Sequence, residues 1–274
     1  MIDRTVSGTG VGSSAERRMA GRVMRVTSPV APLLAEPRAS APLTSQYLGG
    51  RRVEVLEDRG DWRQVRGADE YVGWMHAGYL AEAGGDRGID DQRVSLGCIV
   101  RSASGRRRAL PLAALLDDRD ELVDGDFVPA GDLSSHFPPE GSAIAGSAIR
   151  FFEGTSYLWG GVTPWGADCS GLVQTVFWMH GLVLPRDASQ QATTGTDAGT
   201  DITSLQAGDL LFFSDRTDKR ITHVGISLGH CDMVHLALGR GGYAIESFDS
   251  DVDEYTTKLR ERFLFARRPE FNNK

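Results

Sequence analysis

The chain has few cysteines, no long hydrophobic run and no excess of basic residues. Cys98, Cys169 and Cys231 are its three cysteines, and their wide spacing includes no CxxC pair. This pattern argues against a disulfide framework and against the common zinc and thioredoxin-like motifs. No stretch approaches the roughly 18 apolar residues of a membrane span. A formal net charge of −7 over 274 residues argues against nucleic acid as a partner.

The first 20 residues are rich in serine and glycine, and we expect them to be disordered. They contain no apolar segment of the length that a signal peptide needs. The sequence as it begins therefore predicts a cytoplasmic protein, whereas a mis-assigned start codon would allow a secreted or periplasmic one.

The region before the middle of the chain is predicted to be all-β. Residues 21–83 alternate short apolar stretches with turn signals, which is typical of a small barrel, and Gly60-Asp61 marks one hairpin bend. Residues 83–91 have the composition of a linker. Residues 92–135 repeat the strand-and-turn style more weakly, so the sequence predicts one or two small β modules here.

The sequence pattern changes over residues 144–270, where predicted helices come before predicted strands. "SAIAGSAIRFFEG" has helical spacing, and the segment from Cys169 to Met179 is predicted to be a helix that ends before Gly181. Asp187 and Gln190 have the spacing of a capping box. The predicted strands are 205–213, 223–229, 233–238, 243–248 and 262–268. This order is typical of an α+β fold.

Cys169 is the candidate nucleophile. At the first turn of its helix, unpaired N–H groups and the positive end of the helix dipole should favour the thiolate and lower the pKa of the thiol. Most free cysteines are small buried hydrophobes, and we assign Cys98 and Cys231 to that class. The neighbours Asp168 and Ser170 give Cys169 a polar setting that the other two lack.

Two histidines on consecutive predicted strands are candidate partners for the sulfur. His223 begins one strand, and His235 lies in the next, so both side chains can share a face. We expect His235 to form a hydrogen bond with Nδ1 of His223. This bond would hold Nε2 of His223 towards the sulfur of Cys169. The alternatives are structural strand histidines, or a metal site with His230 and Cys231, although that spacing fits no common zinc signature. The remaining histidines are expected at the surface or in turns.

Five sequence segments, quoted at the end of this paragraph, resemble in their order and spacing those of the NlpC-type family of cell-wall cysteine peptidases. Members of this family have a rearranged papain-like fold. The resemblance covers residues 144–268, and residues 22–80 resemble a bacterial SH3-like domain that ends in "GWMHAGYL". SH3-like domains before such a peptidase are similar to the subgroup that cuts γ-D-glutamyl–L-diamino acid bonds. The segments that carry the resemblance are "YLWGGVTPWGADCSGLVQTVF", "LPRDASQQ", "LQAGDLLFF", "HVGISLG" and "MVHLA".

The resemblance implies roles for four residues. Cys169 would be the nucleophile, His223 the base and His235 the third polar member. Tyr157 would lie near the oxyanion, where its hydroxyl and the backbone N–H of Cys169 could donate hydrogen bonds. No metal and no organic cofactor are implied.

The resemblance also implies a substrate pocket formed by Asp168, Ser170, Asp187 and Ser189. An acidic residue in the Asp187 loop would bind the free α-amine of an N-terminal L-Ala, and Asp187 could equally serve only as a helix cap. Arg186 would bind a substrate carboxylate or remain solvated. From the first SH3-like domain, Glu70 and Tyr71 are the candidates to close the amine end.

The implied reaction is hydrolysis of L-Ala-γ-D-Glu-diamino acid peptides, in muropeptide recycling or wall turnover. The sequence does not distinguish diaminopimelate from L-Lys. Two other classes stay open: a non-catalytic protein that binds the cell wall, and an amidase or acyltransferase of the same fold.

Overall fold

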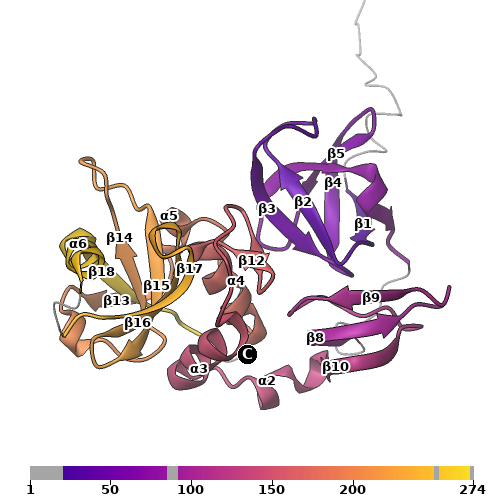
Figure 1. The fold of residues 1–274 in the computed structure, drawn as a ribbon. Helices are drawn as coiled ribbons and strands as arrows, with labels where there is room; N and C mark the ends of the chain where they lie inside the picture. Colours follow the sequence, from indigo (N-terminus) through magenta and orange to yellow (C-terminus); the bar gives the residue numbers. More distant parts are fainter. Residues whose placement is uncertain (1–20, 85–91, 250–252, 272–274) are drawn as a thin grey trace, which may run out of the picture.

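The computed structural model describes residues 21–84, 92–249 and 253–271, and the segment expected to be disordered, 1–20, lies outside them. Figure 1 shows three parts along the chain: an indigo-to-purple β domain, a smaller magenta sheet and a larger domain of helices and strands. These parts are the two predicted β modules and the predicted α+β domain.

The first β domain forms one seven-stranded sheet in the order β3-β2-β6-β5-β4-β1-β7. Alternating apolar residues explain the strands, because side chains such as Val53 and Val55 point inward while their neighbours face solvent. The β4–β5 hairpin turns at Gly60-Asp61, as predicted. The strands are β1 (Arg22–Val26), β2 (Val30–Leu34), β3 (Leu43–Leu48), β4 (Arg52–Arg59), β5 (Trp62–Arg66), β6 (Val72–His76) and β7 (Leu80–Glu82).

The second module is only a three-stranded sheet, in the order β10-β8-β9. Two irregularities interrupt the pairing of β10 with β8. Its buried residues, Val94 and Val100 among them, join the hydrophobic core of the following domain, whereas the first domain has a core of its own. The elements are β8 (Arg93–Arg101), β9 (Arg107–Leu110), β10 (Glu121–Pro129) and a short helix α2 (Leu133–His136).

The third part has a six-stranded antiparallel sheet in the order β13-β18-β14-β15-β16-β17. Helices α3 and α4 pack on one face through residues such as Leu172, and α6 packs on the other through Leu259. No helix in the described ranges is long and apolar enough to cross a membrane. The helices are α3 (Gly141–Phe152), α4 (Cys169–Met179), α5 (Ala188–Gln191) and α6 (Glu254–Arg262); the strands are β11 (Val162–Thr163), β12 (Gly166–Ala167), β13 (Thr196–Gly199), β14 (Leu210–Phe213), β15 (His223–Gly229), β16 (Asp232–Ala237), β17 (Gly242–Ser247) and β18 (Phe263–Arg268).

This arrangement confirms the predicted α+β layout and most of its elements. Helix α4 runs from Cys169 to Met179 as predicted, and Gly181 follows it with a φ of 85°, a left-handed conformation that favours glycine. The predicted strand 205–213 is shorter, since only Leu210–Phe213 is extended. The sequence analysis missed α6, whose polar sequence gave little apolar periodicity.

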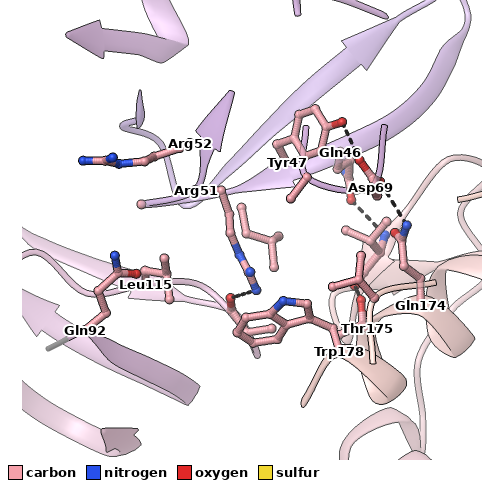
Figure 2. A pocket seen from close by; sticks show the side chains of 16 residues that line it. Gln46, Tyr47, Arg51, Arg52, Asp69, Gln92, Leu115, Gln174, Thr175 and Trp178 are labelled. Atoms are coloured by element: carbon pink, nitrogen blue, oxygen red, sulfur yellow. Dashed lines mark hydrogen bonds between the residues drawn. The ribbon is translucent and has the colours of Figure 1, made fainter. Parts of the chain in front are cut away.

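The three parts meet around a cavity of about 250 Å³, which is shown in Figure 2. Arg51 from the first domain lies over the ring of Trp178 in α4, 3.5 Å from the ring centre. Its guanidinium donates to the carbonyl of Ala113 in the second module at 2.8 Å. Gln174 of α4 donates to Asp69 at 3.0 Å. These contacts fix the first β domain against the helix that begins with Cys169.

Candidate active site

Cys169 is the first residue of α4 and lines a cleft of about 780 Å³. The helix begins there because the carboxylate of Asp168 accepts a hydrogen bond from the backbone N–H of Gly171 at 2.8 Å, which is an N-cap. Residues of α4, of the strand β15 and of the first β domain all contribute to the cleft wall. The cleft size lies in the range of small-molecule sites.

The Cys169 thiol is not ionised by its helix position, so this prediction is wrong for the free protein. Burial and the neighbouring Asp168 carboxylate raise the pKa of the thiol to about 12. Hydrogen bonds from the backbone of Val224 and Ser170, together with the Arg186 guanidinium, act in the opposite direction but do not outweigh burial. The sulfur is therefore held as a thiol, with N–H groups ready to stabilise negative charge when it develops.

His223 lies at the start of β15 and lines the same cleft. Its Nε2 is 2.7 Å from Nδ1 of His235, and the two rings meet edge to face. The structure confirms that the two histidines are paired, but it reverses the ring nitrogens that we expected. Since Nε2 is engaged by His235, only Nδ1 of His223 remains to exchange a proton with Cys169.

Burial and the nearby His235 hold the pKa of His223 well below its usual value. The distant Glu246 carboxylate counteracts this only in part. The ring is therefore neutral near pH 7 and can accept a proton. The Cys169 thiol and the His223 ring, which line the same cleft, are therefore both neutral in the free protein.

Behind the histidines lies a buried carboxylate that the sequence analysis did not single out. Glu246 on β17 is 3.3 Å from Nε2 of His235. Arg240 donates two hydrogen bonds to the same carboxylate, at 2.7 and 2.8 Å. Burial alone would raise the pKa of Glu246, but the hydrogen bonds from His235, Arg240 and Thr256 lower it to about 2. The alternation of "YAIESF" was the available signal, because it puts Glu246 on one face of its strand.

Asp168 and Ser170 lie at the cleft wall, but their side-chain oxygens already form hydrogen bonds with another residue of the protein. Arg186 holds both oxygens of Asp168, at 2.6 and 2.9 Å, and donates to the Ser170 hydroxyl at 2.9 Å. Arg186 is only 1% exposed, so it is neither solvated nor free to bind a substrate carboxylate, and both expectations for it are wrong. Its Nε also donates to Ser45 in the first β domain at 3.0 Å.

Asp187 and Ser189 also line the cleft. Asp187 forms the predicted capping box of α5, and it also hydrogen-bonds to Tyr71. Burial raises the pKa of its carboxyl, despite the opposing effect of Arg186. Tyr71 and Thr44 line the cleft from the first β domain. The first β domain thus contributes to the wall of the cleft beside Asp187, and the role of Tyr71 in closing the amine end stays a prediction.

Glu70 does not belong to this site. Its side chain is 76% exposed and lies 3.5 Å from Arg66, on the outside of the first domain. The residue has a φ of 61°, a turn conformation that directs its side chain away while Tyr71 points into the cleft. The prediction for Glu70 is therefore wrong, and Thr44 is a lining residue that sequence reasoning missed.

Tyr157 lines the cleft beside Cys169. Burial, followed by the charges of Cys169 and Asp168, raises the pKa of its hydroxyl, which therefore stays protonated and can donate a hydrogen bond. Trp159 also lines the cleft and is 70% exposed, so it leaves an apolar ring at the rim. Arg220 and Arg262 line the cleft as well and make it partly basic.

The histidine and cysteine residues proposed as an alternative metal site do not gather in space. His230 and Cys231 form the tight turn between β15 and β16, with φ values of 51° and 70°, at the other end of the strand from His223. Within residues 21–84, 92–249 and 253–271, no three His, Cys, Asp or Glu side chains are grouped as metal ligands. His180 differs from expectation, because it is buried and bonds to Pro138 and Ser147.

Comparison with known proteins agrees with this architecture. The NlpC/P60 family model matches residues 154–261, and the model of the bacterial dipeptidyl-peptidase Sh3 domain matches residues 33–80. The chain is 31% identical over 214 residues to the gamma-D-glutamyl-L-lysine dipeptidyl-peptidase of Bacillus subtilis, covering 70% of this chain and 72% of that protein. It is 35% identical over 272 residues to dipeptidyl-peptidase 6 of Lysinibacillus sphaericus, covering 85% and 94%.

A solved structure extends this similarity to the whole fold. The crystal structure of an NlpC/P60 family protein from Bacillus cereus superposes with a TM-score of 0.75 at 21% identity, over 90% of this chain and 99% of that one. The similar arrangement therefore includes the β domains as well as the α+β domain. The chain belongs to the NlpC/P60 family of peptidoglycan hydrolases.

Proposed function

We propose that this protein is a cysteine peptidase that hydrolyses the γ-D-glutamyl–L-diamino acid bond of peptidoglycan stem peptides with a free N-terminal L-Ala. The observation that carries the proposal is a single cleft lined by Cys169, by His223 and by Asp187, which is bonded to Tyr71 of the SH3-like domain. The names of the relatives, which are dipeptidyl-peptidases, support the same reaction class.

In the first step the sulfur of Cys169 attacks the γ-carbonyl carbon of D-Glu while its proton passes to Nδ1 of His223. The two events are coupled, because the thiol pKa of about 12 and the lowered pKa of the histidine disfavour a resting ion pair. The Tyr157 hydroxyl and the N–H of Cys169 donate to the oxyanion, a contribution of about 3 kcal/mol per donor.

In the second half of the reaction His223, now an imidazolium, gives its proton to the leaving amine of the diamino acid. The C–N bond breaks and a thioester to Cys169 remains. Neutral His223 then takes a proton from water, the hydroxide oxygen attacks the thioester, and the dipeptide acid leaves as the thiol is restored. The same ring nitrogen serves as acceptor and donor in both halves.

The charges of the cleft fit such a peptide. The ammonium of L-Ala would bind to Asp187, whose partial burial strengthens the attraction. The carboxylates of the peptide would face the guanidinium groups of Arg220 and Arg262 at the rim. We propose that Tyr71, which is bonded to Asp187, leaves no room there for a sugar joined to the alanine. An amidase would then have to act first, and released muropeptides would be the substrate pool.

The test is mass spectrometry of L-Ala-γ-D-Glu-diaminopimelate and of its L-Lys analogue after incubation with the enzyme. We expect L-Ala-D-Glu and the free diamino acid as products, no cleavage of the N-acetylated peptide, and no cleavage by Cys169→Ala. Asp187→Asn should raise KM while the N-acetylated peptide remains uncut. Intact free-amine peptides would refute the proposed specificity, and a new amide to an added amine in place of the acid would indicate acyl transfer.

A further inference from the structure

Three side chains form a chain of contacts that begins at His223 in the cleft. His223 touches His235, and His235 touches Glu246, which is 3% exposed. The strand pairing explains the last contact: Glu246 lies opposite Met233 and His235 lies opposite Ala244, so His235 and Glu246 are diagonal neighbours on one sheet face. This is the face that α6 covers, and it is closed to solvent.

The carboxylate at the end of this chain can set the protonation of both rings. With its low pKa Glu246 is ionised and can only accept, so Nε2 of His235 carries the proton of their hydrogen bond. In a neutral His235, Nδ1 is then the acceptor, and Nε2 of His223 must donate to it. The lone pair of His223 is left on Nδ1, which is the nitrogen available to Cys169.

Glu246 also accepts hydrogen bonds from two side chains other than His235. Arg240 donates to both oxygens of the carboxylate, and Thr256 donates to one of them at 2.7 Å. The negative charge is thus already balanced before His235 contributes. A doubly protonated His235 would donate from Nδ1, which would force the proton of His223 onto its own Nδ1 and leave it unable to accept from the thiol.

We propose that Glu246 is a positioning residue which, through His235, holds His223 in the tautomer that has its lone pair on Nδ1. The proposal rests on the proposed function for its effect on catalysis, but the tautomers themselves can be observed without any substrate. Glu246 does not contact the peptide or the sulfur, and it acts only through the two rings.

Three variants separate this role from a structural one. Glu246→Gln keeps an acceptor of the same shape without the charge, and Glu246→Met removes the acceptor. Asp253→Asn is the matched control, because Asp253 also pairs with Arg240, at 2.7 Å, but does not reach His235. In both Glu246 variants Arg240 keeps Asp253 as its partner, so the fold is expected to survive, which circular dichroism and melting curves will check.

The first readout is the nitrogen spectrum of the imidazole rings in ¹⁵N-histidine-labelled enzyme at pH 7. We expect both His223 and His235 as Nε2–H tautomers in the wild type and in Asp253→Asn, and a mixture of tautomers for both in Glu246→Met. Assignment uses His223→Gln and His235→Gln. An Nδ1–H tautomer of His223 in the wild type, or unchanged spectra in a folded Glu246→Met, would overturn the proposal.

The second readout is steady-state kinetics over pH with whichever peptide the enzyme cuts. Glu246→Met should lower kcat on the order of 10- to 100-fold with little change in KM, and Glu246→Gln should lower it less. The acidic limb of kcat/KM should also move to lower pH in Glu246→Gln, because Glu246 raises the pKa of His223. A folded Glu246→Met with wild-type kcat would contradict the proposal. Failure to cut any peptide would count against the proposed function, while the nitrogen spectra would still decide the role of Glu246.

Discussion

Two arginine–carboxylate pairs, each with a buried carboxylate, lie on either side of the candidate reacting atoms and have different roles. On the helix side Arg186 pairs with Asp168, which caps the helix that begins with Cys169. On the sheet side Arg240 pairs with Glu246, which contacts His235. In both pairs the arginine donates two hydrogen bonds to the carboxylate. One carboxylate then caps the helix that carries Cys169, and the other contacts the ring of His235, which contacts His223.

The two pairs differ in how strongly each arginine is required. Arg186 is 1% exposed, and Asp168 has no other cationic partner among the described side chains. Arg240 is 28% exposed and also pairs with Asp253. Removing one partner of a buried pair leaves an uncompensated charge, so the cost should follow burial.

The largest expected effect comes from removing each arginine in turn. Arg186→Met should lower the free energy of unfolding by about 3–5 kcal/mol, because it leaves the Asp168 carboxylate buried without its cation. Arg240→Met should lower it by about 2 kcal/mol, since Glu246 keeps Thr256 as a donor and Arg240 itself is already 28% exposed. Urea unfolding followed by circular dichroism measures both. Equal losses of unfolding free energy in the two variants would show that the Arg186–Asp168 and Arg240–Glu246 pairs stabilise the fold to the same extent.

The acid stability of the protein tests the sheet side. The pKa of Glu246 lies near 2, below its ordinary value of 4.5, so its contribution is present above pH 4.5 and is lost as pH falls towards 2. Such a shift corresponds to about 3 kcal/mol. We expect Glu246→Gln to flatten the dependence of the unfolding free energy on pH between 5 and 3. Glu254→Gln is the control: Lys258 also lowers the pKa of Glu254, but this pair is exposed and screened by solvent, so the slope should change much less.

The reactivity of Cys169 tests the helix side. With a thiol pKa of about 12, alkylation by iodoacetamide in the free enzyme should still rise above pH 9, where an ordinary thiol has levelled off. Asp168→Asn removes the neighbouring negative charge and should increase the rate at pH 8 by several-fold. Glu246→Gln should leave this profile in place, because Glu246 acts on the ring and not on the sulfur. A wild-type rate that levels off near pH 8–9 would contradict the structure.

Much of the fold and the identity of the site were predictable from local signals. The cap before Cys169, the glycine after α4 and the apolar alternation of β15 and β16 are short-range patterns with a direct physical cause. They sufficed to place the cysteine at a helix start and to pair the histidines. The place of Tyr71 beside the cleft was anticipated only through resemblance to a family.

The errors concern effects that depend on several distant segments at once. The pKa of Cys169 is governed by burial, which no local pattern gives. Arg186 is buried because Asp168, Ser45 and Gly161 converge on it from three parts of the chain. The ring nitrogens of the histidine pair follow from the diagonal pairing of strands, which the sequence does not specify.

The smallest expected effect lies at the point where the helix-side pair touches the first β domain. The hydroxyl of Ser45 is buried and accepts a hydrogen bond from Arg186 at 3.0 Å. Among the residues that the structure describes, no hydrogen bond or ion pair links Arg240 or Glu246 to that domain. Ser45→Ala should therefore cost about 1 kcal/mol of stability and raise KM modestly, with kcat little changed. Ser40→Ala, in the same domain but at an exposed contact with Arg38, is the control. If Ser45→Ala lowered kcat and left KM unchanged, the SH3-like domain would act on the reacting atoms and not on the pocket wall.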